Sequence, residues 1–351
     1  MNTAGNQRRI KDTRSMAKRC VVSNYLQSMD VMVLTDKRYL GPSSGQGEPM
    51  EGYIDNLLTE DRLVMDALMA SGLTVDRRAW CDNSVDWSQT KSALFRTTWD
   101  YFDRWDSFSP WLHRVQDQTR LFNAAPIVHW NLDKHYLQDL EQRGVKVVPT
   151  AFIQRQTLLP LFDLMARSGW SDVVIKPAIA GAAVDTYRVT RSGEIATLSP
   201  KLSSKEDCES LWHALLDKQD MLVQPFLSHV IETGEKSLIW IDGEVTHGVL
   251  KRAKSGDFRV QDDHGGTVAP LSVTQTDKDL AQDIMTKCLQ HCATQGWEAP
   301  LYARVDLMRN EEGQWLVSEL EMVEPELWFR FHPEAAQTLA QAIKARLTAS
   351  A

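Results

Sequence analysis

The stretch LVSELEMVEPELWF, residues 316–329, begins with alternating apolar and acidic side chains, which is the pattern of a strand. Successive strand side chains point to opposite faces, so Leu320 and Met322 would enter a core while Glu319 and Glu321 share the other face. Two carboxylates on one face repel each other unless a positive charge lies between them. The stretch therefore predicts a strand whose acidic face meets a cation.

A second strand is predicted just upstream, at YARVDLM, residues 302–308, with the hairpin RNEEGQ joining the two strands. This pairing would bring Asp306 beside the two glutamates. Three carboxylates suit a hard divalent ion such as Mg²⁺, which takes oxygen ligands and leaves positions for phosphate or water. The alternative is an exposed acidic face paired with lysines and arginines.

Length, net charge and cysteine content narrow the class of protein. A chain of 351 residues can form two or three domains, because single domains usually stop growing near about 250 residues. The formal net charge of -8 argues against a nucleic-acid-binding protein, which normally presents a basic face. An odd, scattered set of cysteines fits reduced thiols in a cytoplasmic enzyme; they are Cys20, Cys81, Cys208, Cys288 and Cys292.

The N-terminal residues 1–22 are predicted to form a flexible basic tail, with a start at Met16 as an alternative. They are polar and contain no apolar centre, so they do not resemble a secretory signal. No later run approaches the roughly 18–20 apolar residues of a membrane span, and we expect no membrane contact.

The first third of the chain alternates strands with helices, which predicts an α/β domain with a parallel sheet. Strands are expected at 30–36, 73–80 and 92–99. A helix is expected from a Thr59 cap to Gly72.

The remainder predicts antiparallel sheets with helices, an α+β pattern. Helices are expected at 133–144 and 333–347, and strands at 172–177, 186–190, 221–226, 236–252 and 314–322. The predicted domains are an N-terminal α/β domain at 23–130, a helix with a small domain at 131–225, and a catalytic part at 226–351.

Two segments suggest nucleotide binding. Lys176 ends a buried strand and precedes a loop of small residues around Gly181, whose backbone N–H groups could approach phosphate. In MLVQPFL, residues 221–227, the Gln224 carbonyl and the Phe226 N–H could bind adenine. An ordinary edge strand that ends at proline is the alternative for the second segment.

Taken in order, these segments resemble the ATP-grasp superfamily. The additional matching segments are NLDKHYL, TGEKSLIWIDGEVTHGVLKR and FRVQDDHGG, and the resemblance covers roughly residues 90–330. It is closest to the glutathione-synthetase-like ATP-binding branch and is similar to the cyclo-ligases that close the D-cycloserine ring. The resemblance implies an ATP-grasp fold with an N-terminal parallel-sheet domain, a small lid domain and a C-terminal antiparallel-sheet domain.

The resemblance also assigns ATP and metal ligands. It implies that Lys134 and Lys176 hold phosphates, and that Glu232 or Glu235 reaches the ribose or the substrate side. It implies one or two Mg²⁺ ions, for which Mn²⁺ could substitute. The implied metal ligands are Asp306, Glu319 and Glu321, although the family often has Asn at the third position.

The expected catalytic and substrate residues come from three places. Arg304 shares the strand face of Asp306 and could stabilise the transferring phosphoryl group. Lys251 and Arg259 flank a loop that could hold phosphate or substrate, with a solvated basic loop as the alternative. The expected substrate-binding residues are Gly265 and Gly266 of this loop, and Arg96 and Asp100 after an N-terminal strand.

The predicted function is a Mg²⁺-dependent, ADP-forming ligase that activates a carboxylate as an acyl phosphate and couples it to an amine. The substrate would be amino-acid-like. Ring closure on an O-ureido-serine and intermolecular amide formation are both open at this point. The alternative class is a non-catalytic ATP-binding module, and an oligomer of identical subunits is a further expectation.

Overall fold

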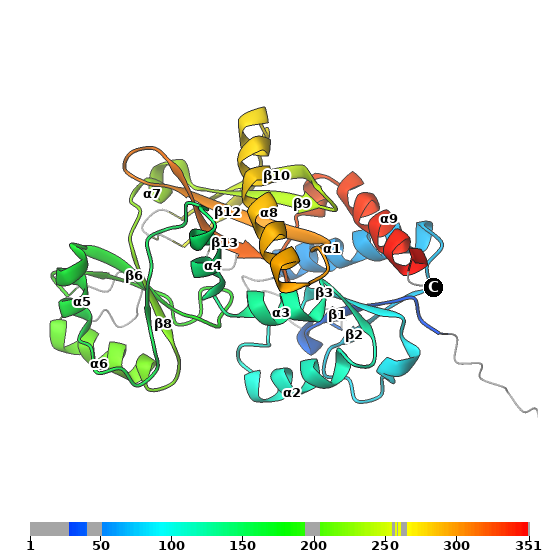
Figure 1. Cartoon of the computed structure of the whole chain (residues 1–351), viewed down its shortest axis with the longest axis horizontal. Helices are drawn as coiled ribbons and strands as arrows, with labels where there is room; N and C mark the ends of the chain where they lie inside the picture. The colour runs from blue at the N-terminus through cyan, green and yellow to red at the C-terminus, as the bar shows by residue number, and fades with distance from the viewer. Residues whose placement is uncertain are drawn as a thin grey trace, which may run out of the picture.

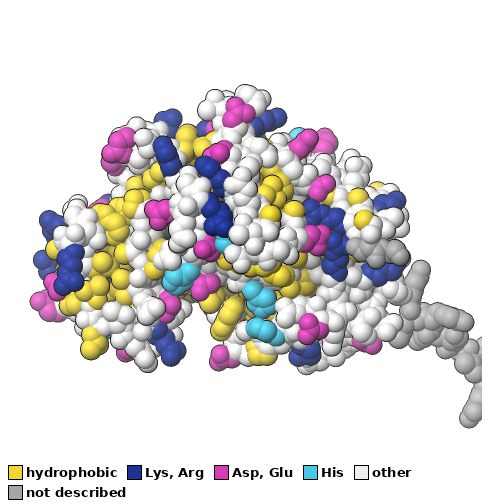
Figure 2. Space-filling view, viewed as in Figure 1, with side chains coloured by type: hydrophobic (Ala, Val, Ile, Leu, Met, Phe, Trp, Pro, Cys, Tyr) yellow, Lys and Arg dark blue, Asp and Glu magenta, His cyan; other side chains and the backbone are white. Residues whose placement is uncertain are grey.

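The structure is a computed structural model that describes residues 28–40, 51–193, 204–254, 257, 259–260 and 265–349. The predicted tail at 1–22 lies outside these residues. The structure has three sheets, each in its own lobe. The lobe formed by residues 151–225, in the middle of the sequence, lies on the left of Figure 1. In the space-filling view a notch on the lower side separates this lobe from the N-terminal one (Figure 2). Among the described helices, none is long and apolar enough to cross a membrane.

The first sheet is parallel, as predicted, with strand order β2-β1-β3-β4. Its strands are β1 (Val31–Thr35), β2 (Val75–Ala79), β3 (Ser92–Thr97) and β4 (Arg120–Phe122). Alternate residues of β1 enter two cores: Val33 packs with helix α1 (Glu51–Ala70), and Leu34 packs with helix α2 (Trp105–Val115). The short helices η1 (Lys37–Tyr39) and η2 (Trp87–Gln89) follow β1 and β2.

The predicted cap at Thr59 is wrong, because α1 already includes the preceding residues from Glu51 onward. Thr59 therefore lies inside the helix rather than at its start. Leu57, ahead of Thr59 in the same helix, is fully buried.

The second sheet is antiparallel with strand order β5-β8-β6-β7. Its strands are β5 (Ala151–Ile153), β6 (Asp172–Pro177), β7 (Tyr187–Thr190) and β8 (Met221–Pro225). Helices α5 (Leu161–Ser168) and α6 (Lys205–Leu216) share a core with this sheet, in which Trp212 is fully buried.

The third sheet is antiparallel and has strand order β11-β10-β9-β12-β13. Its strands are β9 (Glu235–Ile241), β10 (Glu244–Arg252), β11 (Thr267–Pro270), β12 (Tyr302–Arg309) and β13 (Trp315–Glu321). Helix α8 (Gln275–Gln295) packs on one face and α9 (Glu334–Ala349) on the other, where α9 also contacts α1. The helices α7 (His229–Thr233) and η4 (Phe329–Phe331) complete this part.

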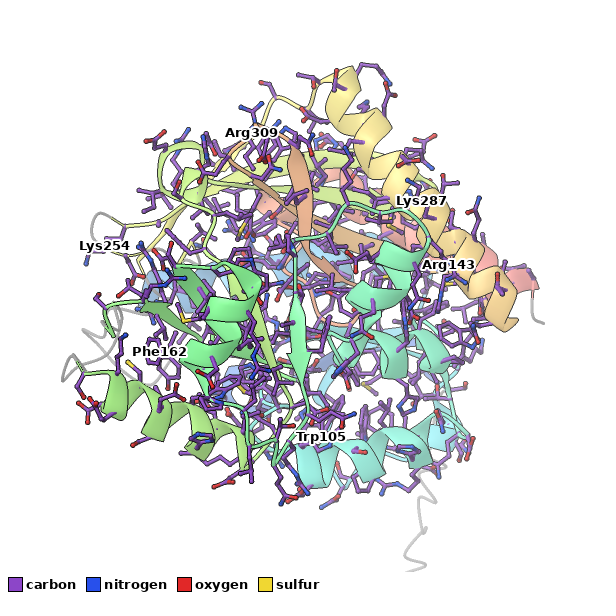
Figure 3. The ribbon with its side chains drawn as sticks, turned by 60° about the vertical axis from the view of Figure 1, so that its left-hand side comes forward. Trp105, Arg143, Phe162, Lys254, Lys287 and Arg309 are labelled. Atoms are coloured by element: carbon purple, nitrogen blue, oxygen red, sulfur yellow. The ribbon has the colours of Figure 1, made fainter. Side chains whose placement is uncertain are left out.

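Helices α3 (Ala125–Leu132) and α4 (Tyr136–Gln142) lead from the first sheet to the second, yet residues of both pack in the core of the third sheet. Lys287 of α8 donates to the carbonyl of Gly144 just after α4, at 3.1 Å. Figure 3 shows Arg143 and Lys287 as neighbours. The segment before β5 therefore packs with the third sheet, while the exact domain boundaries stay predictions.

Strand β13 lies at the edge of its sheet, and side chains satisfy its outer backbone groups. The Asn131 amide donates to the Leu320 carbonyl and accepts from the Met322 N–H, both at 2.6 Å. The Tyr136 hydroxyl accepts from the Leu320 N–H at 2.8 Å. Asn123 adds a bond to the Met322 carbonyl at 2.7 Å. The Val317 backbone on the same edge bonds to Lys146 and Val148. Together these bonds take the place of a full neighbouring strand and fix the position of β13.

We expect Asn131→Ala to lower the free energy of unfolding by roughly 2–4 kcal/mol, because it leaves two buried backbone groups without partners. Asn310→Ala is the control, since Asn310 caps the exposed β12–β13 hairpin by accepting from the Gln314 N–H at 2.7 Å. That change should cost less than about 1 kcal/mol. Urea unfolding measures the free energy of unfolding of both variants. An equal loss in the two variants would contradict the role of Asn131 in holding β13.

Candidate active site

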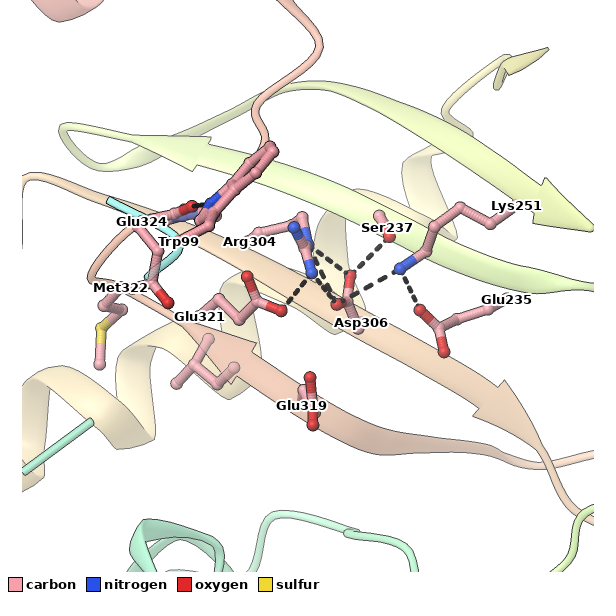
Figure 4. A network of polar contacts seen from close by, with 12 residues as sticks. Trp99, Glu235, Ser237, Lys251, Arg304, Asp306, Glu319, Glu321, Met322 and Glu324 are labelled. Carbon is pink, nitrogen blue, oxygen red and sulfur yellow. Dashed lines mark hydrogen bonds and ion pairs between the residues drawn. The ribbon is translucent and has the colours of Figure 1, made fainter. Parts of the chain in front are cut away.

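Strands β12 and β13 bring the three predicted carboxylates together. In their register Asp306 lies opposite Glu319, and Arg304 lies opposite Glu321. Carboxylate oxygens of Asp306, Glu319 and Glu321 lie within 4.8 Å of one another. The alternation therefore does what the sequence predicted: Leu320 and Met322 are fully buried, and the glutamates face the cluster (Figure 4).

Lysines and an arginine surround the cluster. The Lys176 ammonium lies 3.1 Å from a Glu319 oxygen, and the Lys134 ammonium lies 3.8 Å from it. Arg304 donates through Nε and Nη2 to Asp306, at 3.0 Å and 2.7 Å, and also contacts Glu321. These cations hold the carboxylates together.

Glu235 and Lys251 extend the network on the far side of Asp306. Lys251 pairs with Glu235 and lies 3.5 Å from Asp306, and the Ser237 hydroxyl donates to Asp306 (Figure 4). The network is more than nine-tenths buried at Glu235, Ser237, Lys251, Arg304 and Asp306, which strengthens each charge interaction.

The surroundings move the pKa values of the carboxyls apart. Burial alone would raise the pKa of Glu319, but Lys176 and Lys134 outweigh it and hold that pKa far below its ordinary value. Burial raises the pKa of Glu321 to about 8, because Asp306 and Glu319 oppose the help of Arg304. For Asp306, Arg304 and Lys251 overcome burial and lower the pKa.

The donor set fits Mg²⁺. Three carboxylates within reach of one point supply hard oxygen ligands, and Mg²⁺ keeps further positions for phosphate oxygens or water. Lys134 and Lys176 lie beside the same cluster, where their ammonium groups could meet phosphate.

One cavity of about 240 Å³ gathers most of the predicted site residues. The predicted residues that line it are Lys134, Lys176, Gly181, Gln224, Phe226, Glu235, Lys251, Arg259, Arg304, Asp306, Glu319 and Glu321. Glu232 is exposed on α7 and does not line the cavity, so of the two alternatives it is Glu235 that faces it. Gly265 and Gly266 also lie outside the lining residues.

The predicted adenine pair is wrong in its register. The Phe226 N–H donates to the Asp172 carbonyl of β6 at 2.9 Å, so it is not available to a purine. Along a strand, N–H and C=O groups alternate between the two edges, and the Gln224 carbonyl points the same way as the Phe226 N–H. The edge that faces away from β6 carries the carbonyl of Pro225 and the N–H of Leu227, and both residues line the cavity.

Arg96 and Asp100 are not among the lining residues and bond to the protein itself. Arg96 is buried and donates through Nη1 to the Pro325 carbonyl at 3.1 Å. Asp100 accepts from Trp80 Nε1 at 2.6 Å and pairs with Arg104 at 2.7 Å. The segment after β3 nevertheless reaches the cavity through its aromatic side chains, which are Trp99, Tyr101 and Phe102.

Sequence reasoning missed several lining residues, among them Tyr53, Tyr136, Thr186, Glu324, Glu326 and Trp328. The acidic residues of EPE, directly after the alternating strand, were the signal that could have pointed to Glu324 and Glu326.

The small-residue loop between β6 and β7 approaches the N-terminal domain. Ala182 and Ala183 have φ angles of 48° and 52°, the left-handed region that side chains disfavour. A Cβ atom at Gly181 would lie 2.8 Å from Phe102 Cε1, so this contact requires glycine. The loop therefore packs closely against Phe102.

Comparisons with known proteins agree with this geometry. The family model described as D-cycloserine synthetase DcsG, N-terminal domain, matches residues 31–123. The model described as prokaryotic glutathione synthetase, ATP-grasp domain, matches residues 164–293. The fold, the carboxylate cluster and these matches define an ATP-grasp ligase that joins a carboxylate to an amine, a class that uses ATP with Mg²⁺.

The relatives narrow the family. The chain is 30% identical over 289 residues to cycloserine biosynthesis protein DcsG of Streptomyces lavendulae, covering 81% of this chain and 92% of the relative. It therefore belongs to the family of this cycloserine biosynthesis protein. The crystal structure of D-cycloserine synthetase DcsG matches with a TM-score of 0.73 and 27% identity, covering 90% of this chain and 99% of that one.

The fold extends to more distant ligases. The structure of D-alanyl-alanine synthetase A from Vibrio cholerae has a TM-score of 0.60 and 13% identity, covering 92% of this chain and 99% of that one. At this identity the likeness concerns the fold alone.

We expect Gly181→Ala to raise the KM for ATP about tenfold, which corresponds to about 1.4 kcal/mol, because the new methyl group pushes the loop away from Phe102. Phe102→Ala in the same chain should remove the clash and recover most of the loss. Steady-state kinetics of both single variants and the double variant form a cycle. Additive effects would contradict the contact.

We expect the affinity for Mg²⁺ to fall as the pH is lowered. Because the pKa of Glu321 is raised to about 8, the carboxyl is protonated below that pH and the cation must displace the proton. Affinity should approach a tenfold loss per pH unit below about pH 8 and level off above it. Calorimetry in buffers of different ionisation enthalpy counts the released proton. Glu321→Gln should flatten the profile, and a flat profile in the unchanged protein would contradict the assignment.

Proposed function

We propose that this protein closes a ring on an amino acid of the O-ureido-serine type, using ATP to activate its carboxylate. One observation carries the proposal: residues 31–123 match the N-terminal domain of D-cycloserine synthetase. This same part of the chain supplies Trp99, Tyr101 and Phe102, the aromatic side of the cavity. The match therefore extends to the region that would meet the substrate.

The nucleotide roles are assigned from contacts around the cluster. Lys134 and Lys176 would bind the ATP phosphates, since both lie beside Glu319. The Pro225 carbonyl would accept from the adenine amino group, and the Leu227 N–H would donate to the ring. Glu235, which lines the cavity and pairs with Lys251, would bind the ribose or the substrate.

The metal would be held by Asp306, Glu319 and Glu321, with one or two ions and with Mn²⁺ as a substitute. Bound Mg²⁺ would neutralise phosphate charge during phosphoryl transfer. Arg304 would direct its guanidinium to the transferring group, because it lines the cavity between Asp306 and Glu321. Lys251 and Arg259 would add positive charge from β10 and the loop that follows it.

The reaction has two bond-forming steps. A substrate carboxylate oxygen bonds to the terminal phosphorus of ATP, and the bond from that phosphorus to ADP breaks. The ureido nitrogen next to the ether oxygen then bonds to the acyl carbon, the carbon–oxygen bond to phosphate breaks, and phosphate leaves. The nitrogen gives up its proton to phosphate or water. Water would then attack the carbamoyl carbon and break its bond to the ring nitrogen, which takes up a proton, while carbamate leaves and decomposes to carbon dioxide and ammonia.

The protein's part in these steps is positioning and charge neutralisation, and no side-chain nucleophile is required. Lys134, Lys251 and Arg304 are buried around the cluster, where their charges interact more strongly than they would in water. We further propose that the protein acts in the cytoplasm, where ATP is available. Assembly into an oligomer of identical subunits stays a prediction.

The test is mass spectrometry of reactions that contain the protein, Mg²⁺, ATP and either enantiomer of O-ureido-serine. We expect a ring-closed product, with or without its carbamoyl group, in equal amount to ADP. Glu319→Gln should lower the rate at least about 100-fold, because it removes a metal ligand and the partner of both lysines. A parallel reaction with pooled amino acids tests intermolecular amide formation. If a product forms only with the pooled amino acids, the protein is a ligase that does not close a ring.

A further inference from the structure

Two side chains of the N-terminal domain hold the backbone that follows β13. Trp99 Nε1 donates to the Glu324 carbonyl at 2.9 Å, and Arg96 donates to the Pro325 carbonyl at 3.1 Å. The two bonds lie on consecutive residues, so the backbone around Glu324 is fixed. The Glu324 side chain lines the cavity, and Figure 4 shows it on the side of Glu321, near Trp99.

Glu324 differs from the other acidic residues of the cavity in its partners. Glu319, Glu235 and Asp306 pair with lysines, Glu321 pairs with Arg304, and Glu326 pairs with Arg330. Among the described residues, Glu324 is the cavity-lining carboxylate that has no ion pair within 4.0 Å.

The Glu324 carboxylate has a neutral partner instead. The buried Tyr101 hydroxyl is its neutral neighbour, and both side chains line the cavity. Burial raises the pKa of Glu324 to about 7, against the help of Tyr101 and Lys134. A carboxylate held this way in a cavity is stabilised when a positive ligand arrives.

We propose that Glu324 binds the α-ammonium group of an amino-acid substrate, with Tyr101 orienting its carboxylate. The inference rests on the ligase function proposed above and adds the group by which the substrate is recognised. Trp99 lies beside it and stacks on Tyr53, with ring centroids 6.2 Å apart, so an aromatic surface adjoins the carboxylate. Ammonium groups are attracted to such ring faces as well as to carboxylates.

The position of Glu324 suits an α-amino acid. Figure 4 shows Glu324 on the same side of the network as Glu321, and both line the cavity. The ammonium and carboxylate of an α-amino acid are attached to one carbon atom. A substrate held at Glu324 by its ammonium would therefore present its carboxylate toward the cluster where phosphoryl transfer takes place.

The experiment compares O-ureido-serine with its analogue that lacks the amino group, 3-(ureidooxy)propanoate, by ADP release. The unchanged protein should prefer the amino acid in kcat/KM. In Glu324→Gln this preference should fall about 30-fold or more, because a buried charge pair is lost. The loss should appear in the KM for the amino acid, while the KM for ATP stays the same. A variant that keeps the full preference would overturn the proposal.

Glu326→Gln is the matched control, since it removes a charge from the same cavity but from a carboxylate that Arg330 already holds at 2.5 Å. It should keep the preference for the amino group. Tyr101→Phe should lower the preference less than Glu324→Gln, because the carboxylate remains and only its orientation is loosened. A larger loss in Glu326→Gln than in Glu324→Gln would contradict the assignment.

A binding measurement separates this inference from ring closure. If O-ureido-serine yields no ADP, ring closure fails, and calorimetry with D-serine and L-serine is carried out in Mg²⁺ and a non-hydrolysable ATP analogue. Binding to the unchanged protein that is lost in Glu324→Gln supports the ammonium site on its own. Equal binding by both proteins, or no binding of either serine by the unchanged protein, overturns it.

Discussion

The active site depends on the edge of one strand, β13. Its outer backbone groups bond to the side chains of Asn131 and Tyr136 at one end and to the backbone of residues 146–148 at Val317. A slip of one residue would move Glu319 and Glu321 to the opposite face and put Leu320 in their place. Asn131 and Tyr136 flank Lys134 in the sequence. One short segment therefore fixes both the direction of the proposed metal ligands and the position of a lysine beside them.

The local pattern of the chain was enough to predict much of this arrangement. The alternation at 319–322 settled which side chains are buried there, and Asp306 on the neighbouring strand followed from the hairpin. A bulge at Ser318 places Val317 in the same core as Leu320, which the alternation did not predict. The parallel order of the first sheet followed from strands that alternate with helices. These features rest on neighbours in sequence, which is why a single sequence contains them.

The misses have a common physical cause, because each depends on partners far away in sequence. The direction in which the backbone groups of β8 point is set by its pairing with β6, which no local pattern contains, so the Phe226 N–H was assigned to adenine although it bonds to Asp172. Arg96 was expected to face substrate, yet its partner is the Pro325 carbonyl, 229 residues away. Arg96 therefore holds the backbone after β13 in place and does not line the cavity.

The pairing of Lys134 and Lys176 with Glu319 has a consequence for the order of events. The two ammonium groups act as stand-in counter-ions for a carboxylate that would otherwise need a metal. If the lysines bind phosphate and Glu319 binds metal as proposed, a nucleotide that draws the lysines away would leave Glu319 short of positive charge, and a metal on Glu319 would release the lysines. Each ligand would then raise the affinity for the other, and by thermodynamic reciprocity the gain would be equal in both directions.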